Sequence, residues 1–93
     1  QDLSEVTALA IDETSYKRGH NYLTVAADAE KRAAIFVIEG RGADTIEALA
    51  EDLKKHNAEP EQITSVSIDM SPAFISGVSE HLPNARITFD KFH

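Results

Sequence analysis

Three aspartates in this sequence each follow a bulky apolar residue of the kind that fills the interior of a β-sheet. The three dipeptides are Ile11-Asp12, Ile68-Asp69 and Phe89-Asp90. A charge is poorly placed after such a residue unless the strand ends there, so we expect each aspartate at the carboxyl end of a strand. Ligand sites in open α/β sheets form beyond the carboxyl ends of parallel strands. If these strands are parallel neighbours, the three carboxylates converge.

Converging carboxylates indicate a site for a divalent cation. Carboxylates that are held together repel and raise each other's pKa. A hard cation relieves this repulsion by taking oxygen ligands from both groups. Two such cations about 3.5–4 Å apart activate a nucleophile and stabilise a leaving oxygen in phosphoryl transfer. The alternative interpretation is that these aspartates only terminate strands or cap helices, both of which are common roles for this residue.

The composition narrows the class of protein. The 93 residues include no cysteine, which excludes disulfides, zinc–thiolate sites and thiol nucleophiles. Sixteen acidic and nine basic side chains give a net charge of −7. That charge argues against a self-sufficient nucleic-acid binder but is compatible with an acidic metal site. The longest apolar run, residues 33–38, is too short for a membrane span or a signal-peptide core, so we expect a cytoplasmic protein with no membrane partner.

The first part of the chain is typical of three strands joined by short turns. Apolar runs of strand length cover residues 6–12, 22–27 and 33–38. Polar residues at 14–21 and 28–31 separate these runs. This spacing predicts an antiparallel three-stranded meander.

After residue 40 the apolar period changes from that of a strand to that of a helix. A stripe spaced i, i+3, i+4 and i+7 predicts an amphipathic helix over residues 43–57, and its members are Ile46, Leu49, Ala50 and Leu53. Asp44 and Glu47 are spaced as a capping box for this helix. A strand at 63–69, a helix that starts at Ser71-Pro72 and a strand at 85–89 follow.

The element order is therefore βββαβαβ, and the fold class is α/β. A strand, a crossover helix and a second strand normally form a right-handed parallel unit. We expect a mixed sheet in which the meander is followed by parallel strands, with the helices packed on the sheet.

Several blocks of the sequence resemble the catalytic core of DDE transposases of the IS-L-three insertion-sequence family. The blocks, in chain order, are Ala10-Ile-Asp-Glu-Thr-Ser15, Lys17-Arg-Gly-His20, Ser67-Ile-Asp-Met-Ser-Pro-Ala-Phe74, His81-Leu-Pro-Asn-Ala85 and Phe89-Asp-Lys-Phe-His93. Tyr22-Leu-Thr24 and Ile38-Glu-Gly-Arg41 match further blocks between the second and third of these. The resemblance extends over nearly the whole chain in the order that the family has the blocks, with the helix around residues 43–57 as its least specific part.

The resemblance implies a ribonuclease H-like core in which the first strand is central and the fourth lies beside it. Asp12 and Asp69 are then the first two catalytic acids, and they bind Mg²⁺ or Mn²⁺ for the cleavage and transfer of DNA strands. The implied partners are the transposon ends and the target DNA. A homo-oligomer is compatible with this interpretation.

The resemblance also implies secondary candidates. Asp90 is either a competing second acid or a supporting residue on the adjacent strand. His93 lies three residues later and is a candidate ligand or support for the same site. Independently of the resemblance, Lys17, Arg18 and His20 form a basic loop with Tyr16 and are candidates for contacts with the DNA backbone, although a solvated turn is the favoured explanation.

The third acid of the family, a glutamate on a later helix, has no match before His93. We therefore expect residues 1–93 to be the N-terminal part of a single, truncated catalytic core that is inactive in isolation. The start at Gln1 rather than at a methionine agrees with this expectation.

Two other functions remain open at this point. The first is a non-catalytic regulatory or interaction α/β domain, in which Asp12 and Asp69 would lie apart or be separately capped. The second is a related ribonuclease H-like nuclease that cuts DNA without joining it. In every case Glu13 should point to the opposite face of the sheet from Asp12, because side chains alternate along a strand.

Overall fold

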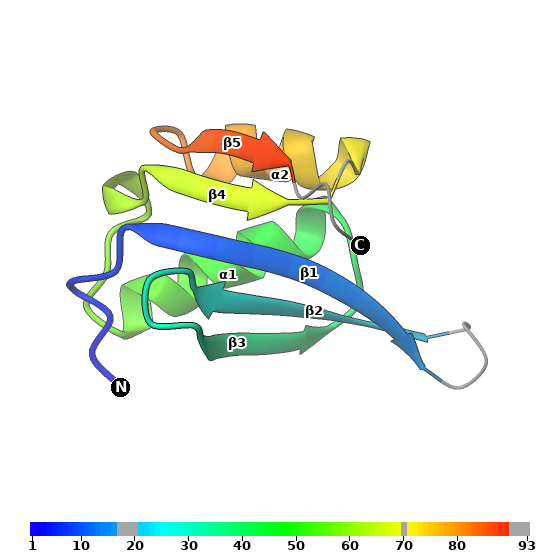
Figure 1. Ribbon diagram of the computed structural model, residues 1–93, viewed down its shortest axis with the longest axis horizontal. Coiled ribbons are helices and arrows are strands. Elements are labelled where there is room, and N and C mark those ends of the chain that lie inside the picture. Colours follow the sequence, from blue (N-terminus) through cyan, green and yellow to red (C-terminus); the bar gives the residue numbers. More distant parts are fainter. Residues whose placement is uncertain (17–20, 70, 90–93) are drawn as a thin grey trace.

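The computed structural model describes residues 1–16, 21–69 and 71–89, which form a five-stranded sheet with two α-helices (Figure 1). The strands are β1 (Ala8–Tyr16), β2 (Asn21–Asp28), β3 (Ala33–Glu39), β4 (Ser65–Ile68) and β5 (Arg86–Phe89). The helices are α1 (Ala43–Lys55), the short 3₁₀ helix η1 (Pro60–Gln62) and α2 (Pro72–His81). The strand order across the sheet is β3-β2-β1-β4-β5. The predicted order of strands and α-helices, βββαβαβ, is confirmed.

The first three strands form the predicted antiparallel meander. β1 pairs with β2 from Leu9 opposite Asp28 to Tyr16 opposite Asn21. Asp28 holds the turn into β3, because its Oδ1 accepts hydrogen bonds from the backbone N–H groups of Glu30 at 2.9 Å and of the next residue at 3.2 Å. Asp28 is buried and both of these bonds are local, so we assign it a structural role.

The last two strands are parallel to β1, as predicted. β4 pairs with β1 and β5 pairs with β4, and both pairings are parallel. Helix α2 provides the crossover between β4 and β5. Its start agrees with the sequence prediction, since Ser71 is the N-cap, its hydroxyl accepts a hydrogen bond from the N–H of Phe74 at 3.4 Å, and Pro72 occupies the first turn.

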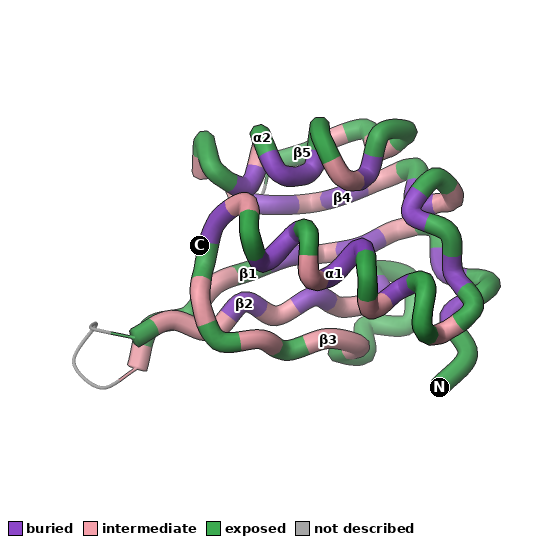
Figure 2. The backbone as a smooth tube through the Cα atoms, turned by 180° about the vertical axis from the view of Figure 1, so that it is seen from behind, coloured by how far each residue is buried: buried purple, intermediate pink, exposed green. Residues whose placement is uncertain are grey.

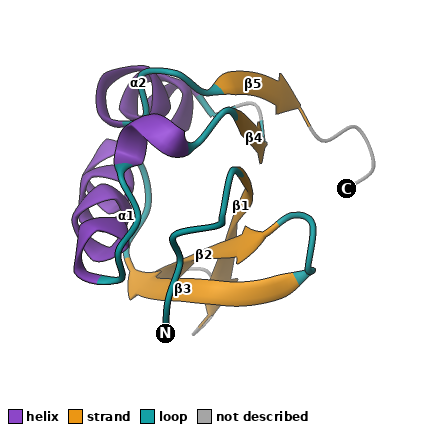
Figure 3. Cartoon of the chain, turned by 90° about the vertical axis from the view of Figure 1, so that its left-hand side faces the viewer, coloured by secondary structure: helices purple, strands orange, loops and turns teal. Residues whose placement is uncertain are grey.

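Both helices pack on the same face of the sheet (Figure 3). Figure 2 shows the buried residues concentrated between the helices and the strands. The core contains the predicted stripes of both helices and the alternate residues of the central strands that face them. Its fully buried members include Leu9, Ile46, Leu49, Leu53, Val66, Ile68, Phe74 and Val78. Burial of these side chains is the main source of stability for so small a domain.

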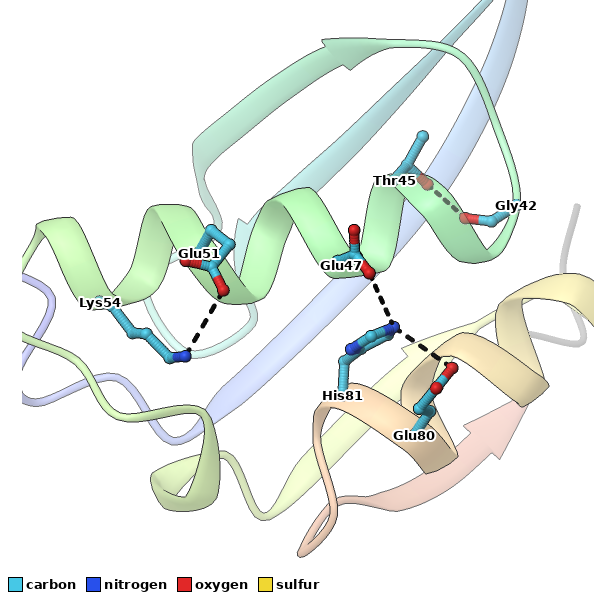
Figure 4. Close-up of polar contacts among 7 residues, drawn as sticks. All are labelled: Gly42, Thr45, Glu47, Glu51, Lys54, Glu80 and His81. Atoms are coloured by element: carbon cyan, nitrogen blue, oxygen red, sulfur yellow. Dashed lines mark hydrogen bonds and ion pairs between the residues drawn. The ribbon is translucent and has the colours of Figure 1, made fainter.

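The two helices approach closely because α2 has a glycine at their contact. A Cβ atom on Gly77 would lie 2.9 Å from Cγ1 of Ile46 and 3.0 Å from Cα of Ala43. At the rim of the contact, Nε2 of His81 lies 3.9 Å from a carboxylate oxygen of Glu47 on α1 and 3.4 Å from one of Glu80 on α2 (Figure 4). Gly77 therefore allows the close spacing of α1 and α2, and the side chains of Glu47, Glu80 and His81 lie at the solvent-exposed edge of the contact between the helices.

The 3₁₀ helix η1 was not expected from the sequence, and it attaches the N-terminal segment to the body of the domain. The side-chain amide of Gln62 donates to the carbonyl oxygens of Leu3, Ser4 and Val6, the last at 2.7 Å. The N–H of Leu3 donates to the carbonyl of His56 at 2.8 Å. These bonds hold the chain where it enters β1.

Two local predictions are wrong. Asp44 does not cap α1, because the N-cap is Gly42 with φ of 89°, and the only cap-region bond of a side chain runs from the Thr45 hydroxyl to the Gly42 carbonyl at 2.6 Å. Glycine adopts a positive φ readily, so it suits this N-cap position. Asp44 lies inside the first turn instead, where its negative charge interacts favourably with the helix dipole. Phe89, expected in the core, is 40% exposed because β5 is an edge strand.

Candidate active site

The register of β1 and β4 places Asp12 beside Asp69. Ala10 is the partner of Ser67 in the parallel pairing. Each of these residues stands two positions before an aspartate. Side chains two positions apart point to the same face of a sheet, and neighbouring strands lie about 4.8 Å apart. Asp12 on β1 and Asp69 directly after β4 therefore both lie on the face that the helices do not cover.

The intervening residues fix that orientation. Ile11 and Ile68 separate the register pair from the aspartates, and both are buried against the helices, 3% and 1% exposed. Their side chains anchor the two strands in the core. The residues that follow, Asp12 and Asp69, must then face away from the helices.

The two aspartates differ in their surroundings. Asp12 is exposed, and its Oδ1 accepts a hydrogen bond from the N–H of Glu13 at 2.9 Å. Asp69 is partly buried and directly follows β4, and its carbonyl oxygen accepts from the N–H of Ser71 at 2.8 Å. One acid is thus carried by a strand, while the other is fixed in the turn that leads into α2.

The structure corrects the expected position of Asp12. The first strand does not end there, because β1 continues to Tyr16 and stays paired with β2 throughout. The charge is tolerated within the strand because it faces solvent and because β1 extends beyond the end of β4 (Figure 1). The two acids are brought together by strand register, with only Asp69 at the end of its strand.

Two carboxylates supply hard oxygen ligands of the kind that Mg²⁺ and Mn²⁺ take from proteins. Within residues 1–16, 21–69 and 71–89, no three carboxylate or imidazole side chains are grouped closely enough to hold a metal ion. The donor set of the described residues thus fits a divalent cation but fills only part of its coordination sphere. The other sequence candidates lie outside the described residues, and they are Lys17, Arg18, His20, Asp90 and His93.

A cavity of about 410 Å³ lies on the other side of the same sheet end. Its lining residues come from β1, from the loop before α1 and from the start of α2, and they are Glu13, Arg41, Gly42, Ser71, Pro72 and Ala73. Glu13 therefore points away from Asp12, toward the helix side, as the alternation of side chains predicts.

Sequence analysis placed Arg41 in a block of the family resemblance but gave it no role. Its guanidinium carbon lies 3.9 Å from the centroid of the Tyr22 ring, which places a cation over an aromatic face. This contact joins the start of β2 to the loop that follows β3, and its two residues are 19 positions apart in sequence. The signal available in the sequence was a single arginine between two glycines, which only the strand register connects to Tyr22.

A comparison with protein families assigns the chain. Residues 9–93 match the model of a family described as transposase, of the IS-L-three type of DDE transposases. The chain belongs to this transposase family. The match includes both Asp12 and Asp69.

Curated relatives agree with this assignment. The chain is 36% identical over 92 residues to the transposase for insertion sequence element IS1001 of Bordetella parapertussis, which covers 99% of this chain and 22% of that protein. It is 35% identical over 85 residues to the transposase for insertion sequence element IS1557 of Mycobacterium tuberculosis, and the match covers 91% of this chain and 19% of that protein. This transposase sequence thus spans about a fifth of the length of the curated relatives that it matches.

Solved structures show the fold. The simian T-cell lymphotropic virus intasome, determined in complex with the PP2A regulatory subunit B56 gamma, matches with a TM-score of 0.61 and 16% identity over 97% of this chain and 34% of that one. The HTLV-2 integrase catalytic core domain in complex with magnesium matches with a TM-score of 0.58 and 16% identity, over 98% of this chain and 66% of that one. The transposase chain has the ribonuclease H-like fold that the resemblance implied. Among its described residues, no helix is both long and apolar enough to cross a bilayer.

Proposed function

We propose that this chain is the N-terminal part of the catalytic core of a DNA transposase, and that Asp12 and Asp69 are two of its catalytic acids. The observation that carries the proposal is the parallel register of Ala10 with Ser67, which sets the two aspartates side by side on the open face. Membership of the transposase family supports the reaction class.

In this proposal Asp12 and Asp69 provide carboxylate oxygens that hold Mg²⁺ or Mn²⁺. A divalent cation bound there supplies activation of the attacking oxygen and stabilisation of the leaving oxygen in phosphoryl transfer. The chain's own contribution is positional: β1 and β4 fix the two carboxylates through the buried side chains of Ile11 and Ile68. The attacking groups are water for strand cleavage and a DNA 3′-hydroxyl for strand transfer.

A third acid must come from elsewhere in the parent protein. Two carboxylates leave much of a cation's coordination to water, and no cluster of three ligands exists among the described residues. The proposal therefore predicts an inactive isolated chain and an active parent enzyme in the bacterial cytoplasm, where its DNA partners are. The relatives come from bacteria.

The test is a strand-cleavage assay with the full-length parent protein and DNA that carries the element's end. Asp12→Asn and Asp69→Asn should each abolish cleavage, because an amide removes the negative charge while keeping the size. Glu51→Gln, on the exposed side of α1, is the matched control and should keep the parent's activity. Full activity of either aspartate variant would refute the assignment.

The same assay distinguishes a transposase from a nuclease that only cuts. A labelled, pre-cleaved transposon end supplied with target DNA should be joined to the target by the parent enzyme. Cleavage without joining would favour the nuclease, while neither activity from a folded parent would favour a non-catalytic domain.

A further inference from the structure

The cavity on the helix side of this sheet end has an exposed arginine, Arg41, in its lining. Its lining also includes residues that lie close to the two acids in the chain: Glu13 directly follows Asp12, and Ser71 lies two residues after Asp69. The carboxyl end of β4 and the starts of α1 and α2 lie at the same end of the molecule (Figure 1). The acids and the cavity therefore share this end of the sheet, on its two faces, and DNA that continues past the acids can reach the cavity.

Arg41 is held in place before any ligand arrives. Its guanidinium lies over the Tyr22 ring, with 3.9 Å from the guanidinium carbon to the ring centroid. Stacking on an aromatic face leaves the N–H groups at the edge of the guanidinium plane available as donors. Arginine in such a setting loses less side-chain freedom when it binds a phosphate.

Arg41 also forms no ion pair with any residue that the structure describes. In the part of the chain that the structure describes, the ion pairs involve Lys54, His56 and His81, and none involves Arg41. This is notable in a chain with a net charge of −7. Arg41 is exposed, whereas Glu13 in the same cavity is partly buried, so the positive group lies on the solvent side.

We propose that Arg41, held over the Tyr22 ring, binds a backbone phosphate of the DNA strand close to the phosphodiester at the Asp12–Asp69 site. This inference rests on the proposed function for the identity of the substrate. The guanidinium contributes a charge-assisted hydrogen bond to a phosphate oxygen, which fixes the position of the strand without reading its sequence.

The experiment measures DNA binding by the full-length parent protein without divalent metal, by fluorescence anisotropy at several salt concentrations. Loss of one phosphate contact in Arg41→Ala should lower the affinity about tenfold and reduce the slope of log affinity against log salt by about 1. Arg41→Lys should keep the slope but recover only part of the affinity. Tyr22→Leu should weaken binding, whereas Tyr22→Phe, which keeps the ring, should not.

Single methylphosphonate substitutions in the DNA locate the contact. Neutralising the phosphate that Arg41 contacts should weaken DNA binding by the wild type but not by Arg41→Ala. A methylphosphonate at any other position should weaken DNA binding by both proteins equally. Arg86→Ala is the matched control, because Arg86 is exposed and pairs with Ser65 at the start of β4, away from the acids. This variant should respond to each methylphosphonate near the cleavage site as the wild type does. Circular dichroism checks that each variant is folded.

Two results would overturn the inference: an unchanged affinity and salt slope in folded Arg41→Ala, or a loss of affinity that no phosphate near the cleavage site accounts for. These results are separate from failure of the proposed function. That failure appears in the cleavage assay of Asp12→Asn, whereas the Arg41 readout is binding in the absence of metal.

Discussion

Ala10 and Ser67 are partners across the parallel strands β1 and β4, and each stands two residues before an aspartate. Neither residue does chemistry. Their pairing nevertheless decides whether Asp12 and Asp69 share one face of the sheet or lie on different ones, because a slip by one residue would turn one acid into the core.

The first prediction concerns metal binding by the acid pair. Mn²⁺ should raise the melting temperature of the wild-type protein, because a ligand that binds only the folded state stabilises it by mass action. The increase should be small, since two carboxylates hold a cation weakly. It should disappear in Asp12→Asn, and differential scanning calorimetry with and without Mn²⁺ measures it. An equal increase in the double variant Asp12→Ala/Asp69→Ala would place the metal elsewhere.

The second prediction concerns the contact between α1 and α2. Gly77→Ala introduces a Cβ at 2.9 Å from Cγ1 of Ile46 and 3.0 Å from backbone atom Cα of Ala43. Overpacking of this kind should lower the free energy of unfolding by about 1–3 kcal/mol, measured by chemical denaturation. Ser76→Ala, at the preceding exposed position, is the control and should change it by less than about 0.5 kcal/mol. Equal effects of the two substitutions would show that the helices separate without cost.

The third prediction concerns the cap of α2. Ser71→Ala removes the hydroxyl that accepts from the N–H of Phe74 and should cost about 1 kcal/mol of unfolding free energy. Because the N–H of Ser71 also binds the carbonyl of Asp69, fraying of this turn should weaken metal binding as well. Ser71→Asp, which restores a capping oxygen, should recover stability. A Ser71→Ala variant as stable as the wild type would mean that the long 3.4 Å bond contributes nothing.

The fourth prediction concerns the pKa of Tyr16. Burial and the nearby Glu39 carboxylate, which accepts a hydrogen bond from the Tyr16 hydroxyl, raise this pKa above its ordinary value of 10.0. The raised pKa stabilises the folded state. This contribution is fully present at pH values below the pKa of Tyr16 in the unfolded chain, and it is lost as the pH rises through the pKa of Tyr16 in the folded protein. Glu39→Gln should lower the pKa but leave the part due to burial.

Ultraviolet absorbance of the phenolate follows this titration, in a Tyr22→Phe background so that only Tyr16 contributes. An unchanged pKa in Glu39→Gln would show that the two side chains do not interact in solution.

The sequence was sufficient for the order of the main elements, for physical reasons that particular residues illustrate. The change from a two-residue to a 3.6-residue apolar period at residue 40 is a local property, and so is the Ser71-Pro72 helix start. The choice of Asp12 and Asp69, and the position of the fourth strand beside the first, came from the family resemblance.

Other features depend on contacts between distant residues and could not be predicted in this way. The extent of β1 to Tyr16 is decided by its partner β2, since polar residues 13–16 carry no apolar alternation. Gly42 replaces Asp44 as the cap because the chain must turn sharply out of β3. The Arg41–Tyr22 stack requires the β2–β3 register, which no local pattern specifies.

Past the end of β4, β1 is paired with β2 alone, and the two strands form a projecting ribbon (Figure 1). Such a ribbon acts as a lever, because its cross-strand hydrogen bonds make it stiff along its length while no other described strand pairs with this part of β1. A force applied near Tyr16 would tilt β1 about its anchored end and carry Asp12 with it. Asp69, held in the turn before α2, would stay in place. Any molecule that pulls on the ribbon would thereby adjust the gap between the two acids.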